Sequence, residues 1–184
     1  IYLIHSSDNI IQNNIIGLSP QCDKKMPNQY GIYLQSSNNN MIGGKAFIDN
    51  NKNINDPTGD KGTVDPVFVR PLYGNIISGN ISNGINFKYS RYNNIMGNFV
   101  GTDCFGLLNF GNGKNGIYFE NSDLNSIIGC GVDSNPFIYY NVSCWNKHNG
   151  IHIHNSNFST VQGNFLGIDS HNSGAAQNLN GLKV

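Results

Sequence analysis

The feature that most constrains the fold of this chain is an internal repeat that returns five times in the same register. Each row opens with an isoleucine, carries a second apolar residue two positions later, and has a serine five positions after its start. The rows start at Ile1, Ile32, Ile85, Ile117 and Ile151, and a further row opens at Leu182. A repeat this regular predicts structural units that pack on their neighbours along one axis.

The spacing within a row predicts short strands separated by polar corners. Apolar residues two positions apart lie on one face of a strand, because strand side chains alternate between faces. Eight residues after each start stands an asparagine, or Ser159 in the last complete row, and such residues favour turns. Rungs of this kind stack about 4.8 Å apart, so we expect buried apolar columns and hydrogen-bonded ladders of asparagine and serine. The sequence therefore predicts a parallel β-solenoid.

Short sequences rich in asparagine and glycine also recur along the chain. Examples are Gly-Asn-Phe-Val-Gly-Thr-Asp at 97–103, Gly-Asn-Phe-Leu-Gly-Ile-Asp at 163–169, Asn-Gly-Ile-Asn-Phe at 83–87 and Asn-Gly-Ile-His-Ile at 149–153. This pattern resembles the parallel β-helix repeats of the pectin-lyase-like superfamily. The resemblance implies an all-β, right-handed, single-stranded parallel β-helix of about five to six rungs. It implies little about activity, because the superfamily holds lyases, hydrolases, epimerases, phage tailspikes and surface proteins.

The second row is longer than the others and contains an insertion, residues 45–73, that is the most charged part of the chain. A solvated surface loop and a loop that binds a ligand or partner are both compatible with this composition. The chain begins inside one row and stops as another opens. We therefore expect residues 1–184 to form a single β-helix domain that is a piece of a longer solenoid.

Charge and hydropathy exclude two classes of partner. The 11 basic and 11 acidic residues cancel, which argues against a nucleic-acid partner because phosphate binding needs a basic face. No apolar run is long enough to span a membrane.

Four cysteines, Cys22, Cys104, Cys130 and Cys144, lack the Cys-x-x-Cys spacing of metal sites. Cys130 and Cys144 share a row and could meet if the loop between them folds back. Cys22 and Cys104 lie in different rows with the long second row between them, so we do not expect a bond between these two.

One outward-facing column of the first strand is rich in aromatic residues: Tyr2, Tyr33, Asn86, Tyr118, His152 and Lys183. Exposed rings on a flat sheet are surfaces on which sugars stack, so Tyr2, Tyr33, Tyr118 and His152 are candidate ligand-binding residues. Tyrosine is also a good strand residue that stacks on itself, which would explain the column without a ligand. In the neighbouring outward column, Lys88 and Glu120 are expected to pair across adjacent rungs.

His152 and His154 are the candidate metal ligands, because alternate residues of a strand share a face and two imidazoles can hold one ion. A third ligand would come from a neighbouring rung, where Glu120 is the best candidate. A lone His-x-His is more often a pair of surface residues. We therefore favour no metal and expect no cofactor.

Asp103 and Asp169 occupy matching positions in their rows and are the candidate catalytic pair. Two rungs separate them, about 9–10 Å, which approaches the carboxylate spacing of an inverting glycosidase, about 6.5–9.5 Å. The alternative is that each carboxylate accepts hydrogen bonds from turn amides. We favour the alternative because no arginine or lysine recurs beside them.

These observations favour a non-enzymatic structural β-helix module of a surface-exposed, virion or fibre protein that binds glycans. The competing function is a polysaccharide-active enzyme, a lyase or glycoside hydrolase of the same superfamily. The expected partners are polysaccharides or glycans, further copies of the chain in a trimer, and coat or fibre proteins. The expected location is extracellular, on a cell surface or on a virion surface.

Overall fold

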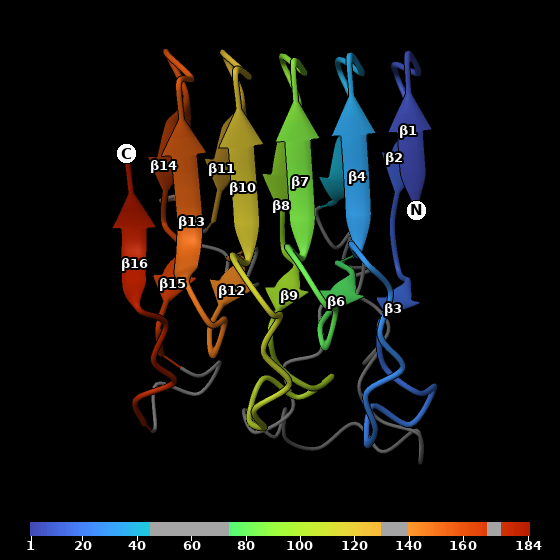
Figure 1. Ribbon diagram of the computed structural model, residues 1–184, viewed down its shortest axis with the longest axis vertical. Helices are drawn as coiled ribbons and strands as arrows, with labels where there is room; N and C mark the ends of the chain where they lie inside the picture. Colours follow the sequence, from blue (N-terminus) through green and yellow to red (C-terminus); the bar gives the residue numbers. More distant parts are fainter. Residues whose placement is uncertain (45–73, 130–139, 169–173) are drawn as a thin grey trace, which may run out of the picture.

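The computed structural model describes residues 1–44, 74–129, 140–168 and 174–184. In these ranges the chain folds into sixteen strands and no helix. The strands form three parallel sheets, and each complete rung gives one strand to each sheet (Figure 1). The predicted parallel β-helix of about five to six rungs is thus confirmed. The insertion at 45–73 lies outside the described residues.

The three sheets, named A, B and C, are built as follows. Sheet A, in front in Figure 1, contains β1 (Tyr2–Ile4), β4 (Ile32–Gln35), β7 (Ile85–Lys88), β10 (Ile117–Glu120), β13 (Asn149–His154) and β16 (Asn180–Lys183). Sheet B contains β2 (Ile10–Ile11), β5 (Met41–Gly43), β8 (Asn94–Met96), β11 (Ser126–Ile128) and β14 (Thr160–Gln162). Sheet C contains β3 (Ile15–Ile16), β6 (Ile76–Ile77), β9 (Phe99–Val100), β12 (Val142–Ser143) and β15 (Phe165–Leu166).

The register of sheet A confirms the alignment of the rows. Ile85 lies opposite Ile32 on one side and opposite Ile117 on the other, and Ile151 lies opposite Leu182. The side chains of these columns fill the interior of the solenoid with no solvent exposure in the middle rungs. Phe87 and Phe119, one rung apart, stack with ring centroids 4.6 Å apart.

Sheet C separates this interior from a second apolar cluster on its outer face. Alternation along each short strand sends Ile77 inward and Ile76 outward, and Val100 inward and Phe99 outward. The outer cluster is covered by loops that follow the sheet C strands of alternate rungs. Among the described residues, these are the first loop, residues 17–31, the third loop, residues 101–116, and Ala176 of the loop that follows β15. The second rung makes a short turn instead between β6 and β7.

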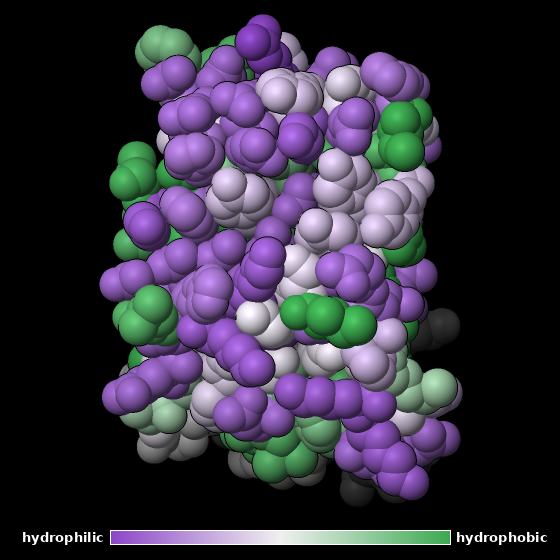
Figure 2. Space-filling view, in the orientation of Figure 1, coloured by the Kyte–Doolittle hydropathy of each residue, from purple (hydrophilic) through white to green (hydrophobic). Residues whose placement is uncertain are grey.

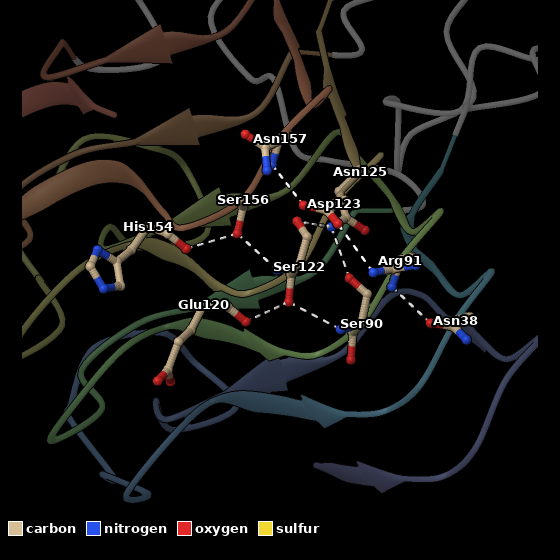
Figure 3. A network of polar contacts seen from close by, with 10 residues as sticks. All are labelled: Asn38, Ser90, Arg91, Glu120, Ser122, Asp123, Asn125, His154, Ser156 and Asn157. Carbon is tan, nitrogen blue, oxygen red and sulfur yellow. Dashed lines mark hydrogen bonds and ion pairs between the residues drawn. The ribbon is translucent and has the colours of Figure 1, made fainter.

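Buried polar columns hold the rungs together at their corners. Asparagine side-chain amides donate to the Oδ1 of their counterparts on the following rung in three ladders and on the preceding rung in the fourth, which confirms the predicted asparagine ladder. The four ladders are Asn9–Asn40–Asn93–Asn125, Asn14–Asn75–Asn98–Asn141–Asn164, Asn28–Asn80–Asn112–Asn146–Asn178 and Asn83–Asn115–Asn149–Asn180. The serine column differs in detail, because each hydroxyl accepts a backbone N–H from the neighbouring rung (Figure 3).

The corner between sheets A and B is made without glycine. Two residues per rung there adopt left-handed backbone, and they include residues as large as Tyr89, Leu124 and Phe158. Side chains across the rungs support the corner: Arg91 forms an ion pair with Asp123 at 3.2 Å, and the Asp123 carboxylate accepts the backbone N–H of Asn157 at 2.8 Å (Figure 3). These polar contacts hold the corner in place, and unfavourable backbone angles persist only where surrounding contacts stabilise them.

Candidate functional site

The outer face of sheet A carries the predicted outward column in the predicted register. Figure 2 shows this face as mostly hydrophilic to intermediate, with hydrophobic residues scattered across it rather than gathered into one patch. The face therefore lacks the continuous apolar surface that large protein partners bury.

The aromatic residues of this column form two separate groups. Tyr2 and Tyr33 stack with ring centroids 5.2 Å apart, and Tyr118 lies beside His152 at 5.1 Å. Asn86 stands between the two groups, buried, with its Oδ1 accepting a hydrogen bond from the Asn83 side chain at 2.7 Å. The four candidate ligand-binding residues are thus brought onto one face but not into one platform.

His152 and His154 project from the outer face of β13. Their ring centroids lie 6.0 Å apart, with the ring planes inclined at 58°. Burial lowers the pKa of His152, and the positive charges of Lys183, His154 and His148 lower it further. A lowered pKa keeps the imidazole neutral at neutral pH, and the neutral ring is the form that binds metal ions.

Glu120, the predicted third ligand, is engaged elsewhere. It lies opposite His154 in the register of β10 and β13, but its carboxylate pairs with Lys88 at 3.5 Å, as the sequence predicted. The Glu120 carboxylate in turn raises the pKa of Lys88. Within the described residues there is no group of three or more histidines, cysteines or acidic residues that could hold a metal ion. The histidine pair therefore offers two side-chain donors at most.

Asp103 makes the contacts of a turn residue. Its side chain is buried, and its Oδ1 accepts the backbone N–H groups of Leu107 at 2.7 Å and Leu108 at 3.0 Å and the Thr102 hydroxyl at 3.2 Å. These are the bonds that the turn alternative requires. Asp169 lies outside the described residues, so the carboxylate pair stays a prediction.

Cys22 and Cys104 lie close together, although the sequence analysis placed them apart. Cys22 and Cys104 belong to one buried apolar cluster, and burial together with that neighbour raises the pKa of the Cys22 thiol to about 12. The two are not bonded to each other, but the assumption that the long second row separates them is wrong. Only a short turn follows β6 in the second rung, so the first and third loops contact each other across that rung. Cys130 lies outside the described residues.

Comparison with known proteins assigns the chain to a family. The sequence model of the family described as "Periplasmic copper-binding protein (NosD)" matches residues 1–173. No curated protein and no solved structure matches the chain. The chain is therefore a parallel β-helix protein of the pectin-lyase-like superfamily, as the repeats suggested. Within that superfamily it belongs to the NosD family of periplasmic copper-binding proteins.

The family corrects part of the prediction from sequence. A periplasmic family lies outside the cytoplasm, which agrees with the broad location we expected, and it is compatible with a non-enzymatic module. The predicted partners, namely glycans, trimers, coat and fibre proteins, are wrong, because the family is described by copper binding. Among the described residues, no helix is long and apolar enough to cross a membrane.

Proposed function

We propose that this chain is a non-enzymatic β-helix module of the periplasm that binds a copper ion through the imidazoles of His152 and His154. The observation that carries the proposal is the 6.0 Å separation of the two ring centroids. A metal–nitrogen bond is about 2 Å long and the nitrogen lies about 1 Å from the ring centre, so two imidazoles on one ion have centroids from about 4 Å apart, with the nitrogens at a right angle, to about 6 Å apart, with the nitrogens on opposite sides of the ion. Imidazole is also a donor that suits copper. The description of the family supports the same ligand.

The strand that carries the pair is held on both sides. β13 pairs with β10 and β16, and the Ser156 hydroxyl donates to the backbone carbonyl of His154 at 2.9 Å (Figure 3). The Tyr118 ring beside His152 restricts that imidazole further. Because sites on rigid strands lose little entropy on binding, this support favours metal binding by only two side chains.

Two side-chain donors leave the remaining coordination positions to water or to groups from a partner. Closed structural metal sites use four protein ligands, whereas sites with open positions exchange what they hold. His154 is exposed, so a second molecule can reach the ion. The arrangement therefore suits a protein that takes up copper and transfers it better than one that stores it.

The test is the copper affinity of the purified protein, measured by competition with a chromophoric chelator. We expect His152→Ala and His154→Ala each to weaken binding about tenfold or more, and the double variant to abolish it. His5→Asn is the matched control: it removes a histidine from the first rung and keeps a residue type that tolerates the left-handed backbone there. Wild-type affinity in the double variant would exclude this site.

A further inference from the structure

The first and third loops contact each other directly although β6 of the second rung lies between β3 and β9 in sheet C. Lys25 of the first loop donates from Nζ to the backbone carbonyl of Gly111 in the third loop at 3.1 Å. Leu18 and Cys22 of the first loop and Cys104 of the third belong to one buried apolar cluster. The short turn of the second rung makes this contact possible, because no second-rung loop stands between the two.

Cys22 occupies a backbone position that the third loop gives to glycine. The Cys22 N–H donates to the Ser19 carbonyl at 2.9 Å, and the Gly106 N–H donates to the Asp103 carbonyl at 3.2 Å, so the two turns correspond. Both residues are left-handed, with φ of 57° at Cys22 and 76° at Gly106. That conformation is unfavourable for residues other than glycine. The first loop thus places a thiol where its counterpart has no side chain.

The side chain at this position faces the third loop. Cys22 and Cys104 belong to the same buried apolar cluster, and Cys104 is a direct neighbour that helps to raise the pKa of the Cys22 thiol. Both residues are buried, with 3% and 7% of their surface exposed, and neither forms a disulfide in this structure. The two buried thiols thus lie in one apolar cluster, on loops already joined by Lys25, and a disulfide forms if the sulfurs close to the S–S bond length of about 2.05 Å.

We propose that Cys22 and Cys104 are a disulfide site, which closes by exchange with a protein or small-molecule disulfide of the periplasm. The thiolate of one cysteine attacks a sulfur of the donor disulfide, forms a mixed disulfide and releases one donor thiolate. The other cysteine then attacks the mixed disulfide and releases the second donor thiolate. The two cysteine protons pass to the two donor sulfurs, so the protein loses two electrons and the donor gains them.

The disulfide would link the first loop covalently to the third loop over the outer face of sheet C. It would also close a long stretch of chain, from 22 to 104, which restricts the unfolded state. We expect the oxidised protein to melt about 5–15 °C above the reduced protein. The thiolate is the attacking species, so the exchange should be faster at pH 9 than at pH 7.

The experiment incubates the purified protein with oxidised glutathione at pH 7 and pH 9. Remaining thiols are then alkylated under denaturing conditions and the linked peptides are identified by mass spectrometry. We expect a Cys22–Cys104 link and the rise in melting temperature, both reversed by dithiothreitol. In Cys22→Gly, which copies Gly106 of the third loop, the reduced protein should fold as before and oxidant should leave its melting temperature unchanged.

Cys104→Ala provides a second variant, for which the same absence of an oxidant effect is expected. The proposal is overturned if Cys22 and Cys104 are both fully alkylated after oxidation at both pH values. It is equally overturned if either residue links to Cys130 or Cys144, or if only glutathione adducts form. None of these outcomes depends on copper binding at the histidine pair.

Discussion

At the residue scale, the stability of this fold depends on buried carboxamides. Asn98 donates from Nδ2 to the backbone carbonyls of Ile42 at 2.9 Å and Met96 at 3.1 Å, and to Asn141 Oδ1 at 3.0 Å. Its own Oδ1 accepts both the backbone and side-chain N–H groups of Asn75. Only a side chain with donors on one atom and an acceptor on the other satisfies both rungs.

The substitution Asn98→Asp keeps this shape and removes the donors. A buried carboxylate would then face the carbonyl oxygens of Ile42 and Met96 and the Oδ1 of Asn141. We expect a loss of about 3–5 kcal/mol in the free energy of unfolding, measured by urea denaturation at pH 7. Asn94→Asp, on the exposed side of β8, should change that free energy by no more than about 0.5 kcal/mol. Equal effects of the two substitutions would refute the structural role of the ladder.

At the element scale, the turn after each sheet C strand shows how closely rungs stack. Gly101 and Gly167 hold equivalent places, since each accepts a backbone hydrogen bond from its own loop, from Phe110 and Ala176 respectively. Both are left-handed, with φ of 97° and 81°. A Cβ on Gly101 would lie 2.0 Å from the Cys144 carbonyl oxygen, whereas the nearest atoms to a Cβ on Gly167 lie 3.8 Å away.

This pair of glycines separates the cost of backbone conformation from the cost of stacking. Gly167→Ala should destabilise the protein by about 1 kcal/mol through its positive φ alone. Gly101→Ala adds a collision with the next rung and should cost about 3 kcal/mol or more. Chemical denaturation of both variants measures the difference. If Gly101→Ala were no worse than Gly167→Ala, the rungs would not be packed as closely as the structure has them.

The sequence predicted the elements that repeat every rung and missed those that do not. Sheets A and B follow from isoleucine columns in fixed register, so the alignment of the rows is enough to place Ile85 and Ile127 in the interior. It does not bring Cys22 to Cys104, because the loops alternate over two rungs whereas the alignment compares single rungs. The left-handed corners were missed for another reason: Tyr89 and Leu124 carry no glycine signal.

The position of the candidate residues was predicted from the sequence, whereas what they bind is a proposal. Strand alternation correctly placed His152 and His154 on one face, and it placed Tyr118 beside His152 in the next rung. From residue types alone we favoured sugar stacking over metal binding, because the outward column is rich in aromatic rings. The ion pair that engages Glu120 was predicted from the row spacing. The separation of the two imidazoles is a side-chain property that spacing does not encode.

At the scale of the whole molecule, the strands of each rung pair only with those of neighbouring rungs, so amide protection should fall from the middle rungs to the ends. β7 and β10 have a paired strand on both sides, whereas β1 and β16 have one on a single side. Hydrogen exchange followed by mass spectrometry should find the amides of β7 and β10 slowest and those of β1 and β16 fastest. Uniform protection across sheet A would show instead that the solenoid opens only as a single unit.

The central claim is that the imidazoles of His152 and His154 bind the same copper ion. Pulsed electron paramagnetic resonance of the protein with one equivalent of Cu²⁺ tests it most directly, because the remote nitrogen of each bound imidazole modulates the signal. We predict modulation from two imidazoles in the wild-type protein, from one in His154→Ala, and an unchanged spectrum in His5→Asn. A spectrum without imidazole coupling, or one that neither His152→Ala nor His154→Ala alters, would contradict the claim.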